Sequence, residues 1–334
     1  MQLVSYNNGS HDQLALLING LLYNADELHP DLPGSIGMLL NYWEDAFPLA
    51  KRAEEGVKAG RFIQNRGIPV EDCLILSPVP FPASLRKGQA FRTHIAAVHR
   101  NLNLPFPEVF DAAPIISFCN HHSIQGPGEV FVMPDDLINT DFELAVAAVI
   151  CKHGRNIPAA HADEYIGGLM IVNNIASRMA HTGTSTISSV TANGKTIATA
   201  AGPVLVTLDE LESFEIPAKV NHTGRCWNLP MTCSINSVKV SEGNLGDMDW
   251  TFAELIESAS YGADIYPGDI ICSGAVGTGC FLELNGAPAF NNPGNELTWL
   301  KASDHISMEV GQLGKLENQI VPDDNRWSIL KNEK

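Results

Sequence analysis

The cysteines are the first candidates for a disulfide framework or a metal site. The chain has seven of them: Cys73, Cys119, Cys151, Cys226, Cys233, Cys272 and Cys280. Their number is odd, and no two are spaced as C-x-x-C. We therefore expect neither a disulfide framework nor a structural zinc site, but single thiols in a reducing compartment.

Two further patterns resemble binding motifs but fit them poorly. His121 and His122 are adjacent, and neighbouring side chains on a strand point to opposite faces, so a loop pair is expected rather than a metal site. The glycine-rich run at residues 274–279 lacks the Gly-Lys-Ser/Thr ending of a phosphate-binding loop. It therefore predicts a tight turn.

Charge and hydropathy restrict the partners. The formal net charge is −17, and such a surface repels phosphate backbones, so we expect no nucleic-acid partner. No apolar run reaches the roughly 18 residues that a membrane span requires, so we expect no membrane partner. The first residues lack the basic start and apolar stretch of a secretory signal, which favours a cytoplasmic protein. An anionic substrate would need a local basic group inside a pocket.

The pattern of expected helices, strands and prolines divides the chain into two expected domains. Residues 1–76 combine short apolar runs, turns and two helical patterns, which predicts a small N-terminal α+β domain. Three alternate prolines within residues 77–82 predict an extended linker. Residues 77–334 form the second domain, with one clear helical stretch at residues 252–259. Short apolar runs predict its strands at residues 129–133, 204–207, 269–272 and 280–284. Together these patterns favour an α+β fold that is mainly β, with a barrel-like or rolled core.

Five ordered segments resemble the fumarylacetoacetate hydrolase family across nearly the whole chain. They are residues 84–94, 141–168, 173–178, 194–203 and 267–280. The resemblance implies a fumarylacetoacetate hydrolase-like β-roll catalytic domain, a homodimer and a small oxo acid as substrate. Members of the family typically cleave a C–C bond of a β-diketo acid. A Mg²⁺ or Ca²⁺ ion on four carboxylates stabilises the developing carbanion, and a His–Glu pair activates water.

The resemblance assigns the water-activating residues to positions that are kept here. His94 takes the place of the general base, and Glu283, on the strand expected at residues 280–284, takes the place of the carboxylate that orients it. Lys195 stands at the lysine position of the family and Arg178 at its arginine position. The resemblance therefore implies a catalytic set of His94, Glu283 and Lys195, with Arg178 binding the substrate.

The same comparison by position shows that the metal ligands are largely lost. Lys87 stands where the family has its first aspartate, and the Glu-x-Glu pair falls on Glu143 and Ala145. The fourth ligand falls on Asn174. One carboxylate and one lysine sum to zero charge, which attracts a hard dication weakly. We expect Lys87 to fill the place of the metal and to pair with Glu143, leaving Glu143 and Asn174 as the remaining candidate ligands.

The expected substrate contacts also differ from the family. Gln89 replaces a tyrosine, Ala275 a threonine and His181 a glutamine. We expect Gln89, His181 and Lys87 to contact the substrate beside Arg178. An alternative alignment places Asp141 on the first residue of the Glu-x-Glu pair, but it needs an insertion inside an expected strand.

Three functions are compatible with these residues. The first is a hydrolase or lyase acting on C–C bonds of small oxo or diketo acids without a metal, with Lys87 supplying positive charge. The second is a non-catalytic member that binds an oxo acid. The third is a weak Mg²⁺- or Ca²⁺-dependent hydrolase that uses Glu143, Asn174 and waters. We expect catalysis, because the base, its orienting carboxylate and Lys195 persist together.

Overall fold

A large mixed sheet forms the centre of the molecule. The computed structural model describes residues 1–62, 67–178, 195–291 and 296–324. The sheet has 14 strands, and its main path runs β4-β3-β2-β1-β15-β13-β11-β21-β6-β7. Its strands are β1 (Gln2–Asn7), β2 (Asp12–Ile18), β3 (Leu21–Asn24), β4 (Ile68–Pro69), β5 (Leu74–Ile75), β6 (Leu85–Gly88), β7 (Ile116–Cys119), β8 (Ile124–Gln125), β10 (Thr140–Asp141), β11 (Leu144–Ile150), β13 (Ile166–Ser177), β14 (Lys195–Ala201), β15 (Leu205–Val206) and β21 (Ile270–Cys272).

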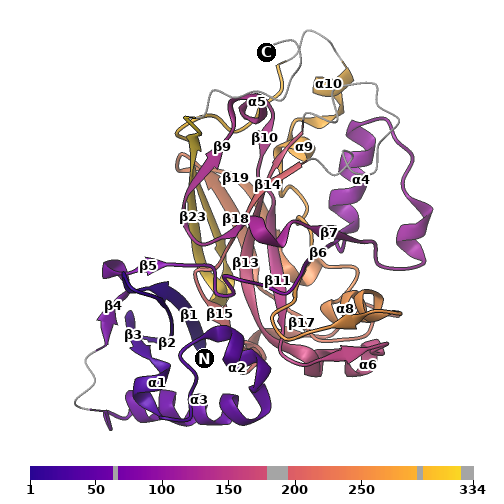
Figure 1. Cartoon of the computed structure of the whole chain (residues 1–334). Helices are drawn as coiled ribbons and strands as arrows, with labels where there is room; N and C mark the ends of the chain where they lie inside the picture. The colour runs from indigo at the N-terminus through magenta and orange to yellow at the C-terminus, as the bar shows by residue number, and fades with distance from the viewer. Residues whose placement is uncertain (63–66, 179–194, 292–295, 325–334) are drawn as a thin grey trace.

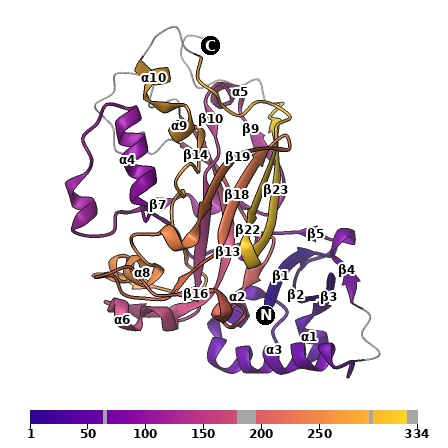
Figure 2. The same ribbon diagram turned by 180° about the vertical axis from the view of Figure 1, so that it is seen from behind.

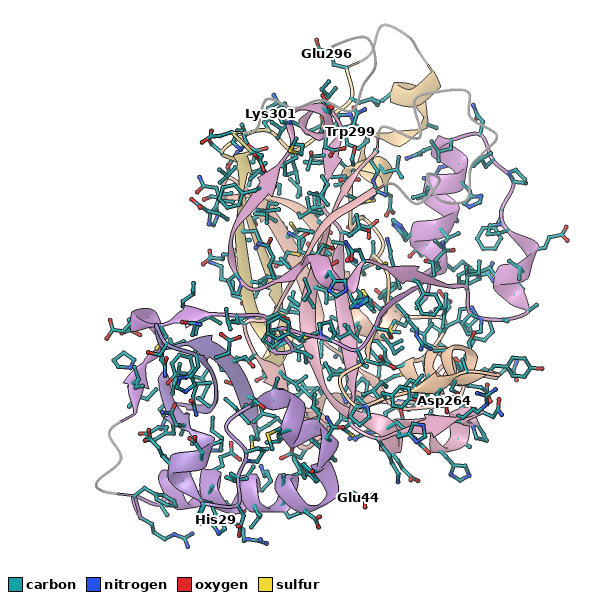
Figure 3. All side chains as sticks on the ribbon, in the orientation of Figure 1. His29, Glu44, Asp264, Glu296, Trp299 and Lys301 are labelled. Carbon is teal, nitrogen blue, oxygen red and sulfur yellow. The ribbon has the colours of Figure 1, made fainter. Side chains whose placement is uncertain are left out.

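A second sheet packs against the first. Its five strands follow the order β19-β18-β22-β23-β9, and they are β9 (Gly128–Val132), β18 (Pro230–Ile235), β19 (Val238–Asn244), β22 (His305–Val310) and β23 (Gly314–Pro322). Side chains fill the space between the layers (Figure 3). Two short hairpins complete the strands, namely β12 (Gly154–Arg155) with β20 (Asp264–Ile265) and β16 (Glu215–Ile216) with β17 (Cys226–Trp227). Within the described residues the sheets do not close into a barrel, so the rolled core is present but the closed form is not.

The central strand β11 is buried on both faces. Leu144 and Val146 belong to the core that faces the second sheet. Ala145 and Val149 belong to the core on the opposite face, because successive side chains alternate across a strand. A strand covered on both sides shows no alternation of polar and apolar residues. That is why residues 144–150 read as one continuous apolar run.

The helices cover the sheets at different places (Figures 1 and 2). They are α1 (Ala25–Leu28), α2 (Ile36–Asn41), α3 (Trp43–Lys58), α4 (Arg92–Asn101), α5 (Pro134–Leu137), α6 (Ala159–Ala162), α8 (Phe252–Ser260), α9 (Phe281–Leu284) and α10 (Gly286–Asn291). Helices α2 and α3 pack under the N-terminal strands, whereas α4, α9 and α10 lie at the other end of the large sheet. None of the described helices is long and apolar enough to cross a membrane.

The N-terminal region has the α+β content predicted from the sequence. Strands β2 and β3 form a hairpin, and α3 overlaps the second helical pattern. This region also continues the large sheet, because β1 pairs with β15 through Gln2 opposite Val206. The division into domains at residues 76 and 77 stays our proposal.

The strand predicted at residues 280–284 is wrong, because the chain forms α9 there. The Asp141 carboxylate accepts the backbone N–H groups of Phe281 and Leu282 at 2.7 and 3.0 Å. Amides in the first turn of a helix have no partner within the helix, so this carboxylate stabilises the helix start. The strands predicted near residues 129–133, 204–207 and 269–272 are confirmed as β9, β15 and β21, and α8 is confirmed as well. The glycine-rich run is the loop between β21 and α9.

Gly274, directly after β21, gives a test of this loop. Its φ is +79°, and an added Cβ would collide with the carbonyl oxygen of Gly88. We expect Gly274→Ala to lower the free energy of unfolding by about 2–4 kcal/mol through backbone strain and steric overlap. Gly268 has a φ of +88° with open space around it, so Gly268→Ala should cost about 1 kcal/mol. Urea unfolding measures both losses of stability. If Gly274→Ala and Gly268→Ala lowered the free energy of unfolding equally, the close approach of the loop to β6 would be contradicted.

Candidate active site

Four charged side chains, three of them buried and Lys87 half-buried, meet where β6, β10 and the end of β13 come together. The Lys87 ammonium forms an ion pair with Oε2 of Glu143. Arg178 donates from Nη2 to Oε1 of Glu143 at 2.9 Å and from Nε to Oδ2 of Asp141 at 3.0 Å. The ion pair of Lys87 with Glu143 predicted from the sequence is therefore present, and Arg178 and Asp141 extend it into a network of four charges.

The network is electrically balanced. Asp141 also accepts N–H groups from Phe142, Phe281 and Leu282. Burial raises the pKa of Asp141, but four donors converging on one carboxylate favour its ionised form. Burial also opposes ionisation of Glu143, yet the charges of Lys87 and Arg178 outweigh it and lower the pKa of Glu143 to about 2. Two cations and two carboxylates thus give a net charge of zero.

The residues at the metal positions of the family do not fit a hard dication. Both oxygens of Glu143 are engaged by cations, and Ala145 has no ligand atom. Oδ1 of Asn174 accepts the hydroxyl of Thr199 at 3.0 Å, and its amide points at the Cys272 sulfur 3.8 Å away. Mg²⁺ and Ca²⁺ need several oxygen ligands and negative charge. The side chains at these positions offer neither enough free oxygen ligands nor a net negative charge.

A histidine–carboxylate pair lies beside the charged network. Nδ1 of His94, on α4, is 2.8 Å from Oε2 of Glu283, on α9, and the two side chains are 12% and 10% exposed. The amide of Asn101 donates to the carbonyls of Leu282 and Glu283 at 3.0 and 2.8 Å, which ties α9 to α4. With Nδ1 engaged, Nε2 of His94 is the ring nitrogen left for a proton transfer.

A cavity of about 280 Å³ joins the two groups. Its lining includes Lys87, Gln89, His94, Glu143 and Arg178. The structure therefore brings together five of the residues singled out from the sequence, and Glu283 stands directly behind His94. A cavity with a histidine, a lysine and an arginine at one end suits a small anionic substrate.

The other predicted site residues fall elsewhere. Asn174 is buried under the site and does not line the cavity. Lys195 begins β14, with its backbone opposite Ser177, and the placement of its side chain is not described. His181 lies outside the described residues. The pair His121 and His122 occupies a single helical turn in a loop, as expected.

The sequence alone does not identify the roles of Asp141 and Cys280 at this site. It offers Asp141 only as a metal ligand in the alternative alignment, because nothing in the sequence shows that Asp141 reaches α9 and Arg178 at once. Cys280 lies next to the base, and ligand atoms of His94, Cys280 and Glu283 are within 4.8 Å of one another. Burial raises the pKa of the Cys280 thiol well above its usual range. A protonated thiol is a poor metal ligand, so a hydrogen-bonded His–Glu pair describes this group better.

Glu143 gives this network a pH signature. The pKa of Glu143 is below the ordinary value of 4.5 in the folded protein, so its stabilisation is present above about pH 4.5 and is lost as the pH falls toward 2. The loss is about 3 kcal/mol. Glu143→Gln should remove this pH dependence and cost about 3–5 kcal/mol at neutral pH, because Lys87 and Arg178 lose their shared partner.

Denaturant unfolding over a pH series measures both effects. Glu129 is exposed and matches Glu143 in chemistry, so Glu129→Gln should change neither the neutral stability nor its pH dependence. An unchanged acid limb in Glu143→Gln would show that the network does not hold this carboxylate ionised.

Comparison with known proteins places this site in a family. The model of the fumarylacetoacetate (FAA) hydrolase C-terminal domain matches residues 84–321. The mitochondrial oxaloacetate tautomerase FAHD2A of Homo sapiens is 27% identical over 320 residues, covering 94% of this chain and 88% of the human protein. A FAHD2 homologue of Dictyostelium discoideum is 25% identical and covers 77% of each chain.

Solved structures share the fold at lower identity. A putative HpcE protein from Mycobacterium smegmatis superposes with a TM-score of 0.71 at 20% identity, covering 97% of this chain and all of that one. The maleylpyruvate hydrolase of Sphingobium sp. SYK-6, solved with manganese(II) and pyruvate, gives a TM-score of 0.68 at 16% identity with the same coverage. The family model spans well over half of the sequence, so the chain belongs to the fumarylacetoacetate hydrolase family.

Proposed function

We propose that the chain is a metal-independent enzyme that hydrolyses a C–C bond of a small oxo or diketo acid. The observation that carries the proposal is that the His94–Glu283 pair and the Lys87 ammonium reach one cavity. The relatives support the substrate class, since two of them are named for oxo acids. Mg²⁺ or Ca²⁺, expected from the family resemblance, has no role in the proposal.

The chain's own groups supply each step of the reaction. His94 takes a proton from water through Nε2, while Glu283 holds the ring and stabilises the imidazolium. The resulting hydroxide adds to the distal carbonyl carbon of an acylpyruvate. The C–C bond then breaks, its electron pair passes to the pyruvate enolate, and the imidazolium returns the proton to carbon. The products are a carboxylic acid and pyruvate.

Lys87 provides positive charge where the enolate forms. An ammonium is a point charge that stabilises an adjacent oxyanion, though less strongly than a dication. Glu143 and Arg178 hold the ammonium in place, and Arg178 also lines the cavity. Gln89 reaches the same cavity, and Lys195 and His181 remain proposed contacts from the family resemblance.

Oxo-acid tautomerisation is the second candidate. The human relative named oxaloacetate tautomerase aligns with 94% of this chain, and tautomerisation only breaks a C–H bond and forms an O–H bond, or the reverse, without cleaving a C–C bond. A single base beside a monovalent cation is sufficient for that step. The homodimer and the cytoplasmic compartment also stay proposals, and the human relative is named as mitochondrial.

Turnover of acetylpyruvate by chelator-treated protein tests the proposal. We expect pyruvate release that added Mg²⁺ or Ca²⁺ does not raise, and a loss of about 100- to 10,000-fold in His94→Gln or Glu283→Gln. His161 is an exposed histidine, so His161→Gln is the matched control and should retain full activity.

Each other result selects a different function. Activity that chelation abolishes and Mg²⁺ restores identifies a metal-dependent hydrolase with a reduced site. Enol–keto conversion of oxaloacetate without pyruvate release identifies a tautomerase. Saturable binding of acetylpyruvate with neither reaction identifies a non-catalytic binding protein.

A further inference from the structure

One wall of the cavity is apolar, and most of it follows a single helix, α4. Phe91, Ile95, Val98 and Leu102 line the cavity, and their spacing places them on one face of α4, from the residue before the helix to the residue after it. Leu104 and Leu282 extend the wall beyond the helix. These side chains are three or four residues apart, so they form one continuous apolar stripe along the helix. A ligand could therefore contact several of them at once.

This wall is open to the cavity rather than packed shut. Phe91 and Ile95 are buried, Val98 and Leu102 are half-buried, and Leu104 is 52% exposed. Half-exposed apolar residues around a concave site are typical of surfaces that a ligand covers. The wall therefore has area left to bury.

The charged groups belong to the other side of the cavity. Lys87 lies on β6, whereas Glu143 directly precedes β11 and Arg178 directly follows β13, and His94 is a polar residue of α4 that lines the cavity with them. His99 also lines the cavity, but its Nδ1 is 2.6 Å from the carbonyl oxygen of Pro105. Among the described residues that line the wall, none carries a permanent charge.

Charge balance decides how many carboxylates a ligand brings. The net charge of the network of four side chains is zero. The Lys87 ammonium nevertheless has three N–H donors, and its ion pair with Glu143 uses only one side of the ammonium. The remaining donors suit one carboxylate or enolate. A second carboxylate would lie against the apolar wall, where it would lose water without gaining a partner.

We propose that the substrate is a mono-anionic oxo acid with an apolar chain, whose chain packs along the stripe of α4. The placement of the oxo-acid group of the substrate rests on the proposed function, whereas the preference for an apolar substrate tail rests on the apolar wall. The oxo and carboxylate oxygens face Lys87 and His94, and the chain passes Ile95 and Val98 toward Leu104. The apolar wall thus determines specificity, and α4 carries both the base and the selector.

Calorimetric titration of the full chain with α-keto acids of growing length tests this inference. The series is pyruvate, α-ketobutyrate, α-ketovalerate and α-ketocaproate, with α-ketoglutarate as the dianionic comparison. We expect the Kd to fall about three- to fourfold for each added methylene. We expect α-ketoglutarate to bind more weakly than α-ketovalerate, which has the same number of carbons.

Two variants link the trend to the wall. Leu104→Ser and the isosteric Val98→Thr should each reduce the gain per methylene to less than twofold. Leu74 is 65% exposed and does not line the cavity, so Leu74→Ser is the matched control and should keep the full trend.

The outcomes separate this inference from the proposed function. A Kd that does not depend on chain length, or tightest binding of α-ketoglutarate, overturns the apolar-chain assignment while acetylpyruvate turnover still stands. A full trend that survives Leu104→Ser and Val98→Thr also overturns the assignment to α4. Absence of binding by every keto acid, together with absence of turnover, overturns both.

Discussion

The site depends on one electrostatic constraint, which is that Glu143 is buried between two cations. A carboxylate that is 2% exposed cannot stay ionised without partners. Lys87 and Arg178 supply them, and Asp141 in turn balances Arg178. Buried networks of this kind contribute little net stability compared with apolar residues of equal volume, although breaking one pair is costly. Their effect is to fix geometry, and here they hold an ammonium at the end of a cavity.

The same network fixes the acid–base pair. Asp141 accepts the first amides of α9, and α9 carries Glu283, which holds the ring of His94. The position of the base therefore follows from the position of a carboxylate that never touches it. Arg178 and His94 are thus connected through the hydrogen bonds of Asp141, through α9 and through Glu283.

The sequence was sufficient for three of the four strands expected in the second domain and for the pairing of Lys87 with Glu143. Apolar runs predict β9, β15 and β21 because these segments are buried by the sheets on which they lie. The pairing followed from the family resemblance, which puts Lys87 and Glu143 at ligand positions of one metal, and from their opposite charges. The helix α9 could not be predicted, because its start is stabilised by Asp141, 140 residues earlier in the chain. The apolar face of α4 has ordinary helical spacing, and the sequence does not show that its neighbour is a cavity rather than a core.

In our proposal an amine takes the place of the dication, and this exchange changes which substrates the pocket can hold. A site with four carboxylates and a metal can bind several oxygens of a polyanionic ligand at once. A neutral network with one ammonium has fewer donors and less field to offer, and the net charge of −17 repels a dianion twice as strongly as a monoanion. Affinity must then come from contacts other than charge. The stripe of α4 provides such contacts within the same cavity, so the loss of the metal ligands and the apolar wall are two parts of one change in the kind of ligand that the site can bind.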